Sequence, residues 1–247
     1  MRARHARRRT TDEGKRPALR GAHRNVRLAL QALAGTVLSG ESSAERDAVL
    51  VHVLWTGIVD EEKAGRVVQR LMRPDLFNGW GIRTLSYQER RYNPMGYHLG
   101  TVWPHDNSLI AAGFRRYGHD EEAARIFVGL LEAAMEFEDY RLPELFTGFG
   151  REEYGQPVRY PVACHPQAWA AGSVPFLVET FLGLAPDAFN KRLNIVNPFL
   201  PDFINQVELR HLRIGSSSVN VRFERRDGSL EVQVGDVTGD LKIEVQN

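Results

Sequence analysis

Glu144 is the carboxylate whose surroundings best suit acid–base chemistry. It lies in the segment Arg141–Phe149, directly after a proline and among apolar and aromatic residues. A carboxylate on a rigid, partly desolvated loop can act as a general base, because desolvation moves its pKa toward the working range. A loop glutamate can equally pair with a nearby arginine and do no chemistry. The residues alone leave both interpretations open.

A second group of polar and aromatic side chains immediately precedes a predicted helix. Indole rings stack on sugar rings and paired polar groups bind sugar hydroxyls, so this group suits carbohydrate binding. Asp106 or Asn107 could instead cap the helix. The candidate substrate-binding residues here are Tyr97, His98, Trp103, His105, Asp106 and Asn107.

Two more aromatic segments lie at predicted helix starts. Cys164–Trp169 contributes Gln167 and Trp169 as candidate substrate-binding residues, and the segment 54–58 contributes Trp55. Each places an aromatic ring beside a hydrogen-bonding group. Single tryptophans also commonly belong to the protein core, so this alternative stays open.

Neither a metal nor a cofactor is expected. His98, His105 and Asp106 lack the i, i+4 spacing of a zinc-binding helix, and no further ligand set accompanies them. Cys164 is the single cysteine, which excludes an internal disulfide and fits a reducing compartment. It lies next to His165 without a third, orienting group, so the two do not make a convincing nucleophile pair.

The elements that position these side chains are predicted to be mostly helical. Apolar residues recur at helical spacing, and capping residues, glycine or proline mark the ends. A short link predicts that two of the helices form an antiparallel hairpin. Two long connections, 74–104 and 141–166, are expected to carry function. The predicted helices span 23–39, 60–72, 106–117, 120–138 and 166–182, the last an inner helix kinked at Pro175.

The pattern changes after Pro198. Apolar and polar residues then alternate, which is typical of strands with one buried face. Asp227 and Gly228 form a typical hairpin turn. The sequence therefore predicts a small antiparallel β appendage after the helices.

The N-terminal segment 1–27 is strongly basic, although the whole chain has a net charge of only +1. It holds ten Lys or Arg against Asp12 and Glu13. Such an arm can bind nucleic acid, but it has no aromatic residues on which bases could stack, so nucleic-acid binding is the less favoured interpretation. No apolar run suits a membrane span or a secretory signal. We therefore expect a folded, cytoplasmic protein.

Three segments taken together resemble the amylo-α-1,6-glucosidase family, which includes glycogen debranching proteins and resembles the mannosylglycerate hydrolases. They are Gly100–Asn107, Leu142–Leu145 and Pro161–Trp169, and the resemblance covers about Leu54 to the C-terminus. It implies a six-hairpin glycosidase, an (α/α)6 toroid in which paired carboxylates hydrolyse α-linked glucosides with inversion, in carbohydrate metabolism. Glu144 then falls on the general base. The sugar pocket would be lined by Trp103, His105, Asp106, Gln167 and Trp169.

The chain also departs from that family. The family's general acid is an aspartate in a Gly-Trp-Lys-Asp type motif, and nothing in residues 1–53 resembles it. Only about half of the helices of a closed toroid can be counted. We therefore expect a mainly α fold, with a basic and partly disordered leader at 1–48, the C-terminal half of the toroid at 49–197 and the β appendage at 198–247.

A site with only one of its two carboxyl groups has a clear consequence. Inverting hydrolysis needs both groups, about 6.5–9.5 Å apart. The sequence therefore predicts a glycosidase fragment that is inactive alone, or active when another polypeptide supplies the acid. Exposed half-barrel faces predict self-association. The alternative is a non-catalytic carbohydrate-binding or scaffold fragment, and the choice of glycoside stays open.

Overall fold

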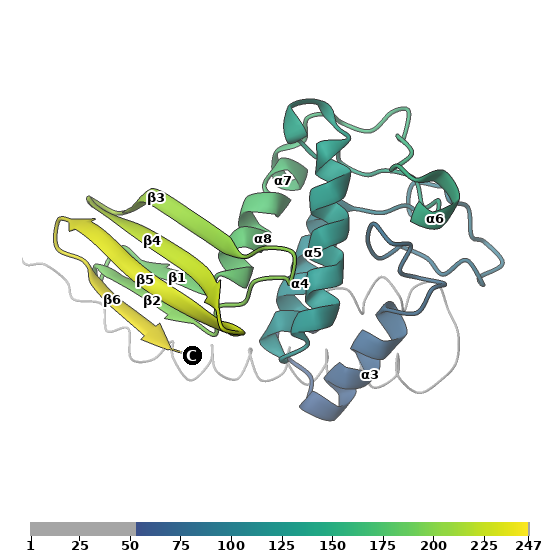
Figure 1. Ribbon diagram of the computed structural model, residues 1–247. Coiled ribbons are helices and arrows are strands. Elements are labelled where there is room, and N and C mark those ends of the chain that lie inside the picture. The colour runs from purple at the N-terminus through teal and green to yellow at the C-terminus, as the bar shows by residue number, and fades with distance from the viewer. Residues whose placement is uncertain (1–52, 247) are drawn as a thin grey trace, which may run out of the picture.

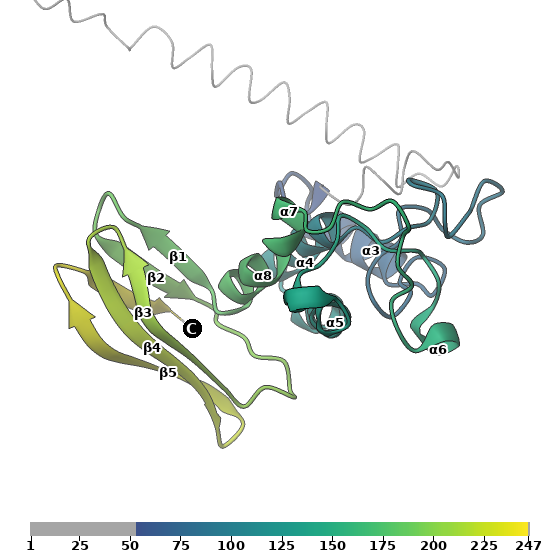
Figure 2. The ribbon, with the colours of Figure 1, turned by 90° about the horizontal axis from the view of Figure 1, so that it is seen from above.

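The computed structural model describes residues 53–246. The predicted helix at 23–39 and the basic leader lie outside this range. The described chain forms a helical unit followed by a β-sandwich, which lie next to each other (Figures 1 and 2). None of the described helices is long and apolar enough to cross a membrane. The cytoplasmic location stays a prediction.

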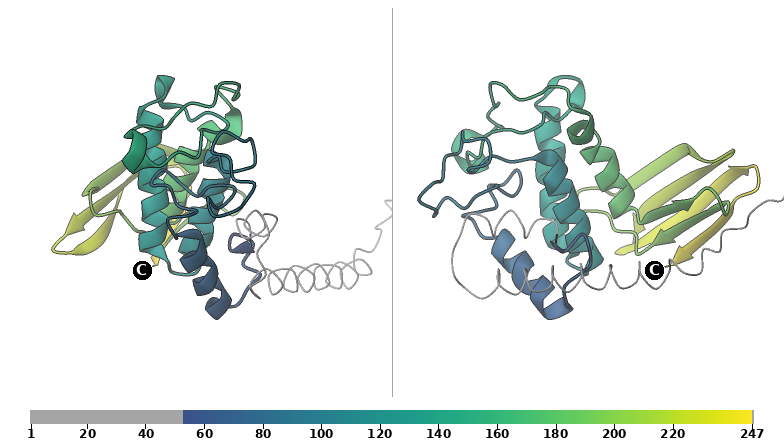
Figure 3. Two further views of the ribbon diagram at one scale, coloured as in Figure 1. Left: turned by 90° about the vertical axis from the view of Figure 1, so that its right-hand side faces the viewer. Right: turned by 180° about the vertical axis from the view of Figure 1, so that it is seen from behind.

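Two neighbouring helices, α4 (Pro104–Arg116) and α5 (Asp120–Met135), stand at the centre of the helical unit (Figure 3). Gly118 has a φ of 75° and turns the chain between them. Only glycine adopts this conformation without strain. Phe114 of α4 and Ile126 of α5 are completely buried in the shared core. The predicted helical hairpin is confirmed.

Helix α3 (Glu61–Leu71) confirms the helix predicted at 60–72. Asp60 caps it, because its side chain accepts a hydrogen bond of 2.9 Å from the Lys63 backbone N–H, which satisfies a free donor of the first turn. The helix packs one apolar face on the core. The buried residues of that face are Ala64, Val67, Val68 and Leu71.

The inner helix predicted at 166–182 is two helices, α7 (Ala168–Ala171) and α8 (Ser173–Phe181). The break is at Gly172 and not at Pro175. Pro175 lies in the first turn of α8, where its missing N–H costs nothing, whereas a continuous helix would press its ring on the carbonyl four residues earlier. Neighbours cover one face of these two helices only. That face consists of Ala170, Ser173, Leu177 and Phe181.

In the part of the chain that the structure describes, six strands form two three-stranded sheets that pack face to face. One sheet has the order β1-β2-β6, with β1 and β2 antiparallel and β2 and β6 parallel. The other has the order β3-β4-β5 and is antiparallel throughout. The strands are β1 (Leu184–Asp187), β2 (Arg192–Val196), β3 (Gln206–Ile214), β4 (Ser217–Arg226), β5 (Ser229–Thr238) and β6 (Lys242–Gln246).

The alternating pattern of β4 explains the sandwich. Val219, Val221 and Phe223 point into a core shared with Leu193 and Ile195 of β2. The outer face is exposed to solvent. Ion pairs join neighbouring strands there, such as Arg226 with Glu231 at 3.6 Å. The predicted hairpin turn is confirmed: Arg226 pairs with Ser229 across it, and both turn residues have positive φ.

The expected fold class is wrong. A mainly α partial toroid was predicted, whereas the described residues combine helices with two three-stranded sheets. Strand structure begins at Leu184 and not after Pro198. The alternating pattern predicted only a small appendage after Pro198, but the two sheets together enclose a core of their own.

Candidate active site

Two long connections between the helices cross each other and build the site. Val102 and Phe146 exchange both backbone hydrogen bonds, each 3.0 Å, and Phe146 also bridges to Arg159. Gly148 lies so close to the Gly100 carbonyl that a side chain at position 148 would overlap it. The crossing brings the segment around Tyr97 beside the segment that carries Glu144.

Asn107 fastens one of these connections to α4. Its Oδ1 accepts a hydrogen bond of 2.6 Å from the Ile82 N–H, and its Nδ2 donates to the carbonyls of Ile82 (3.1 Å) and Trp103 (3.0 Å). The side chain is 1% exposed. Both polar groups are therefore used inside the protein, and the structure does not place Asn107 where it could bind a substrate. Asp106 lies beside it in the first turn of α4.

Hydrogen bonds from Tyr97, Cys164 and Gln167 hold Glu144 at the crossing. Its Oε1 accepts from the Tyr97 hydroxyl at 2.6 Å, and its Oε2 accepts from the Cys164 backbone N–H at 3.3 Å. The Gln167 side chain forms a further hydrogen bond with the carboxylate. The Glu144 side chain is 9% exposed. Its carboxylate is thus fixed in one place at the edge of the core.

These hydrogen bonds determine the protonation states of Glu144 and Tyr97. The hydrogen bond from Tyr97 lowers the pKa of Glu144 more than burial raises it, and the bonds from Cys164 and Gln167 lower this pKa further. The same hydrogen bond raises the pKa of Tyr97 to about 12. At neutral pH the tyrosine is therefore a proton donor and Glu144 is an ionised acceptor.

Replacement of Tyr97 by phenylalanine is expected to raise the pKa of Glu144, because it removes the strongest hydrogen bond to the ionised form. Any reaction that uses ionised Glu144 should then lose activity at a higher pH than in the wild type. The acidic limb of the profile of kcat/KM against pH measures this shift. An unchanged limb would mean that Tyr97 does not control the carboxylate.

Trp103 and His98 form an inner aromatic layer beside Tyr97. The His98 and Trp103 rings stack at 5.0 Å with an interplanar angle of 14°, and Tyr97 meets Trp103 edge-on at 4.9 Å. Trp103 is 6% exposed, whereas Tyr97 is 42% exposed. His98 is exposed too, so Tyr97 and His98 lie nearer to solvent than Trp103 does.

Trp169 and His105 form the outer aromatic surface. Their rings stack at 4.7 Å with an angle of 12°, and Trp169 is 50% exposed. The Trp169 indole N–H donates to Oε1 of Gln167, whose side chain also contacts Glu144. This surface, which we call the Trp169 platform (His105, Gln167 and Trp169), is thus connected to the carboxylate.

Trp55 lies elsewhere. Its backbone packs on Gly113, in the last part of α4, and its carbonyl accepts from Arg116 at 3.4 Å. Trp169 instead stacks on His105, in the first turn of α4. About eight helical residues separate His105 from Gly113, which is roughly 12 Å along the helix. The structure therefore does not bring Trp55 to the site.

Two residues at the site were missed by the sequence analysis. Thr101 is fully buried and its hydroxyl donates to the Tyr97 carbonyl at 2.7 Å. Tyr160 lies 6.1 Å from the Tyr97 ring, centroid to centroid. Thr101 lies inside the recognised Gly100–Asn107 segment, so its position was a usable signal. Nothing local marks Tyr160.

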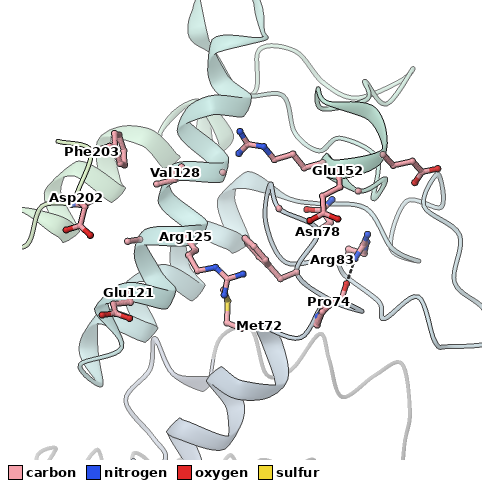
Figure 4. Close-up of a pocket in the computed structure, with 18 of the residues that line it drawn as sticks. Met72, Pro74, Asn78, Arg83, Glu121, Arg125, Val128, Glu152, Asp202 and Phe203 are labelled. Carbon is pink, nitrogen blue, oxygen red and sulfur yellow. Dashed lines mark hydrogen bonds between the residues drawn. The ribbon is translucent and has the colours of Figure 1, made fainter.

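A separate cavity of about 1040 Å³ lies along α5 (Figure 4). Its lining mixes apolar side chains such as Met72 and Phe203 with Glu121 and Arg125, and the Arg125 guanidinium lies 4.8 Å from the Phe77 ring centre. Neither Glu144 nor the Trp169 platform lines it. Among the described residues, no group of three or more His, Cys, Asp or Glu side chains could hold a metal ion.

Comparison with protein families shows the family to which the chain belongs. A model described as the mannosylglycerate hydrolase MGH1-like glycoside hydrolase domain matches residues 21–154, more than half of the chain. The chain belongs to this glycoside hydrolase family. The match includes Glu144 and starts N-terminal of Leu54, where the sequence analysis placed the beginning of the resemblance. It supports the predicted glycoside hydrolase class but not the glycogen-debranching subgroup.

Individual proteins similar to this chain are named mannosylglycerate hydrolases. A mannosylglycerate hydrolase of Rubrobacter radiotolerans is 28% identical over 101 residues, which are 39% of this chain and 23% of that protein. A GH63 mannosylglycerate hydrolase from Thermus thermophilus, solved in complex with glucose, is 25% identical with a TM-score of 0.41 over 51% of this chain and 27% of that one. The same enzyme in complex with Tris gives 27% identity, a TM-score of 0.41 and coverage of 50% and 27%. The chain spans about a quarter of the length of these relatives.

Proposed function

We propose that this chain provides the general base and a sugar-binding surface of an inverting glycosidase. The observation that carries the proposal is the fixed, ionised carboxylate of Glu144, held by Tyr97 and connected through Gln167 to the exposed ring of Trp169. A base needs a defined position and an unprotonated state. A sugar needs an aromatic surface beside that base. Both lie within one cluster.

The reaction follows from these positions. Glu144 takes a proton from a water molecule, and the water oxygen attacks the anomeric carbon from the side opposite the leaving group. The glycosidic bond breaks as a general acid protonates the departing oxygen. We propose that this acid, a second carboxyl group, comes from a segment outside the described residues. Without it, hydrolysis of an ordinary glycoside should be very slow, because each such group contributes about 100- to 10,000-fold.

The substrate class that we propose is a small α-linked glycoside of the mannosylglycerate type. The family description and the name of the Rubrobacter relative support this choice. α-Linked glucosides of the debranching type are the second candidate, because the three recognised sequence segments resemble that family. The two candidates share the base and differ in the sugar and the group attached to it.

Binding of mannosylglycerate by the full chain, measured by calorimetry, is expected to depend on Trp169. Trp169→Ala should weaken it by about tenfold, since aromatic contacts contribute about 0.5–1.5 kcal/mol beyond buried area. Trp55→Ala is the matched control, because Trp55 is 45% exposed, close to the 50% of Trp169, and lies outside the site.

Each outcome of this binding experiment is informative. Equal loss in both variants would argue against the Trp169 platform as the sugar-binding surface. Tighter binding of maltose than of mannosylglycerate would favour the debranching-type substrate. Sugar binding that survives Glu144→Gln, in a chain that does not hydrolyse even an α-glycosyl fluoride, whose leaving group needs no general acid, would favour a non-catalytic carbohydrate-binding protein.

A further inference from the structure

Trp103 is buried, and its indole N–H is directed at the backbone of its own loop. Its Nε1 donates to the Tyr97 carbonyl at 3.2 Å and to Oγ1 of Thr101 at 3.1 Å. The Thr101 hydroxyl itself donates to the same carbonyl at 2.7 Å. The Tyr97 carbonyl therefore accepts two hydrogen bonds from a buried pair of side chains.

Tyr97 needs such an anchor. It lies on a loop and is 42% exposed, and an exposed side chain on a loop ordinarily samples several rotamers. Its hydroxyl nevertheless lies 2.6 Å from Oε1 of Glu144. A hydrogen bond of this length requires the backbone of Tyr97 to stay in place, because small shifts of distance and angle weaken it steeply.

The packing of the rings supports the same conclusion. The Tyr97 and Trp103 rings meet in a T-shaped arrangement, with centroids 4.9 Å apart and an interplanar angle of 80°, a favourable geometry for aromatic pairs. His98 covers Trp103 by stacking on it. The Trp103 indole is thus enclosed by residues of its own loop, and its N–H donates hydrogen bonds to that loop.

We propose that Trp103 is a positioning residue, which together with Thr101 anchors Tyr97 so that the tyrosine hydroxyl stays on Glu144. This inference rests on the proposed role of Glu144 as the base, and it differs from the expectation that Trp103 lines the sugar pocket. The aromatic contact with the sugar then falls to the Trp169 platform.

The test is the titration of Glu144 in the full-length chain, followed by NMR with carbon-13-labelled glutamate side chains. The signal of Glu144 is identified by its absence in Glu144→Gln. Trp103→Phe keeps an aromatic ring and removes the N–H; Thr101→Val keeps the shape of the side chain and removes the hydroxyl. Tyr97→Phe shows the full effect of losing the hydrogen bond to the carboxylate. Trp80→Phe is the matched control, because the buried Trp80 N–H has no hydrogen-bond partner among residues 53–246.

We expect the titration midpoint of Glu144 to rise in Trp103→Phe and in Thr101→Val, in the direction of Tyr97→Phe but by less, and to stay unchanged in Trp80→Phe. Midpoints equal to that of the wild type in both variants would overturn the proposal. If Trp103→Phe does not fold, Thr101→Val decides alone. The measurement needs no turnover. A shifted midpoint in a chain that does not hydrolyse even an α-glycosyl fluoride, which needs no general acid, would therefore contradict the proposed function and not the positioning role.

Discussion

Replacement of Glu144 by glutamine is expected to lower the hydrolysis of an α-glycosyl fluoride by about 100- to 10,000-fold, the usual contribution of a general base. Fluoride leaves without being protonated, so this substrate needs a base and no general acid. It therefore isolates the part of the reaction that Glu144 is proposed to perform. The measurement is the rate of fluoride release from α-mannosyl and α-glucosyl fluoride by the 247-residue chain.

The matched control for this experiment is Glu138→Gln. Glu138 is an exposed glutamate in the short helix η2 (Glu138–Tyr140), six positions before Glu144, and the same substitution there should leave the rate unchanged. A comparable loss in both variants would point to a general effect of charge. Equal rates in wild type and Glu144→Gln would reject Glu144 as the base. Efficient hydrolysis of mannosylglycerate itself by the chain would show that an acid is present within it.

Replacement of Asn107 by alanine is expected to destabilise the chain by about 2–4 kcal/mol, because it removes three hydrogen bonds of a buried side chain and leaves buried groups unpaired. Ile82 is 2% exposed, so water does not easily reach its backbone N–H to replace Oδ1 of Asn107. The connection from α3 to α4 would also lose its attachment to α4. The free energy of unfolding, from denaturant titration, measures the effect.

Asn93→Ala is the comparison for Asn107. Asn93 is exposed and its Oδ1 accepts from the Met95 N–H at 3.0 Å, a donor that water can satisfy at the surface. Such a substitution ordinarily changes stability by less than about 0.5 kcal/mol. If Asn107→Ala unfolded at the wild-type denaturant concentration but lost sugar binding, Asn107 would be a substrate ligand and not a structural residue.

Local signals in the sequence predicted individual elements well. Asp60 with two following glutamates predicted the start of α3, and Gly118 predicted the turn between α4 and α5, because capping and positive φ are properties of single residues. The fold class was predicted wrongly, because no local signal reports how strands combine. Whether β1 to β6 form a minor appendage or a sandwich with its own core depends on contacts between strands far apart in the chain, such as β2 with β6.

The sequence by itself determined helix α3, the hairpin of α4 and α5, the turn at Asp227 and Gly228, and Glu144 as the candidate base. Only the tertiary structure decided which side chains meet. It brought the Tyr97 hydroxyl into hydrogen-bond contact with Glu144, although the two residues are 47 positions apart in the sequence. It left Trp55 at the other end of α4, away from the site. The physical reason is that these contacts depend on the crossing of two long loops at Val102 and Phe146. The hydrophobic periodicity that predicts helices and strands contains no information about such a crossing.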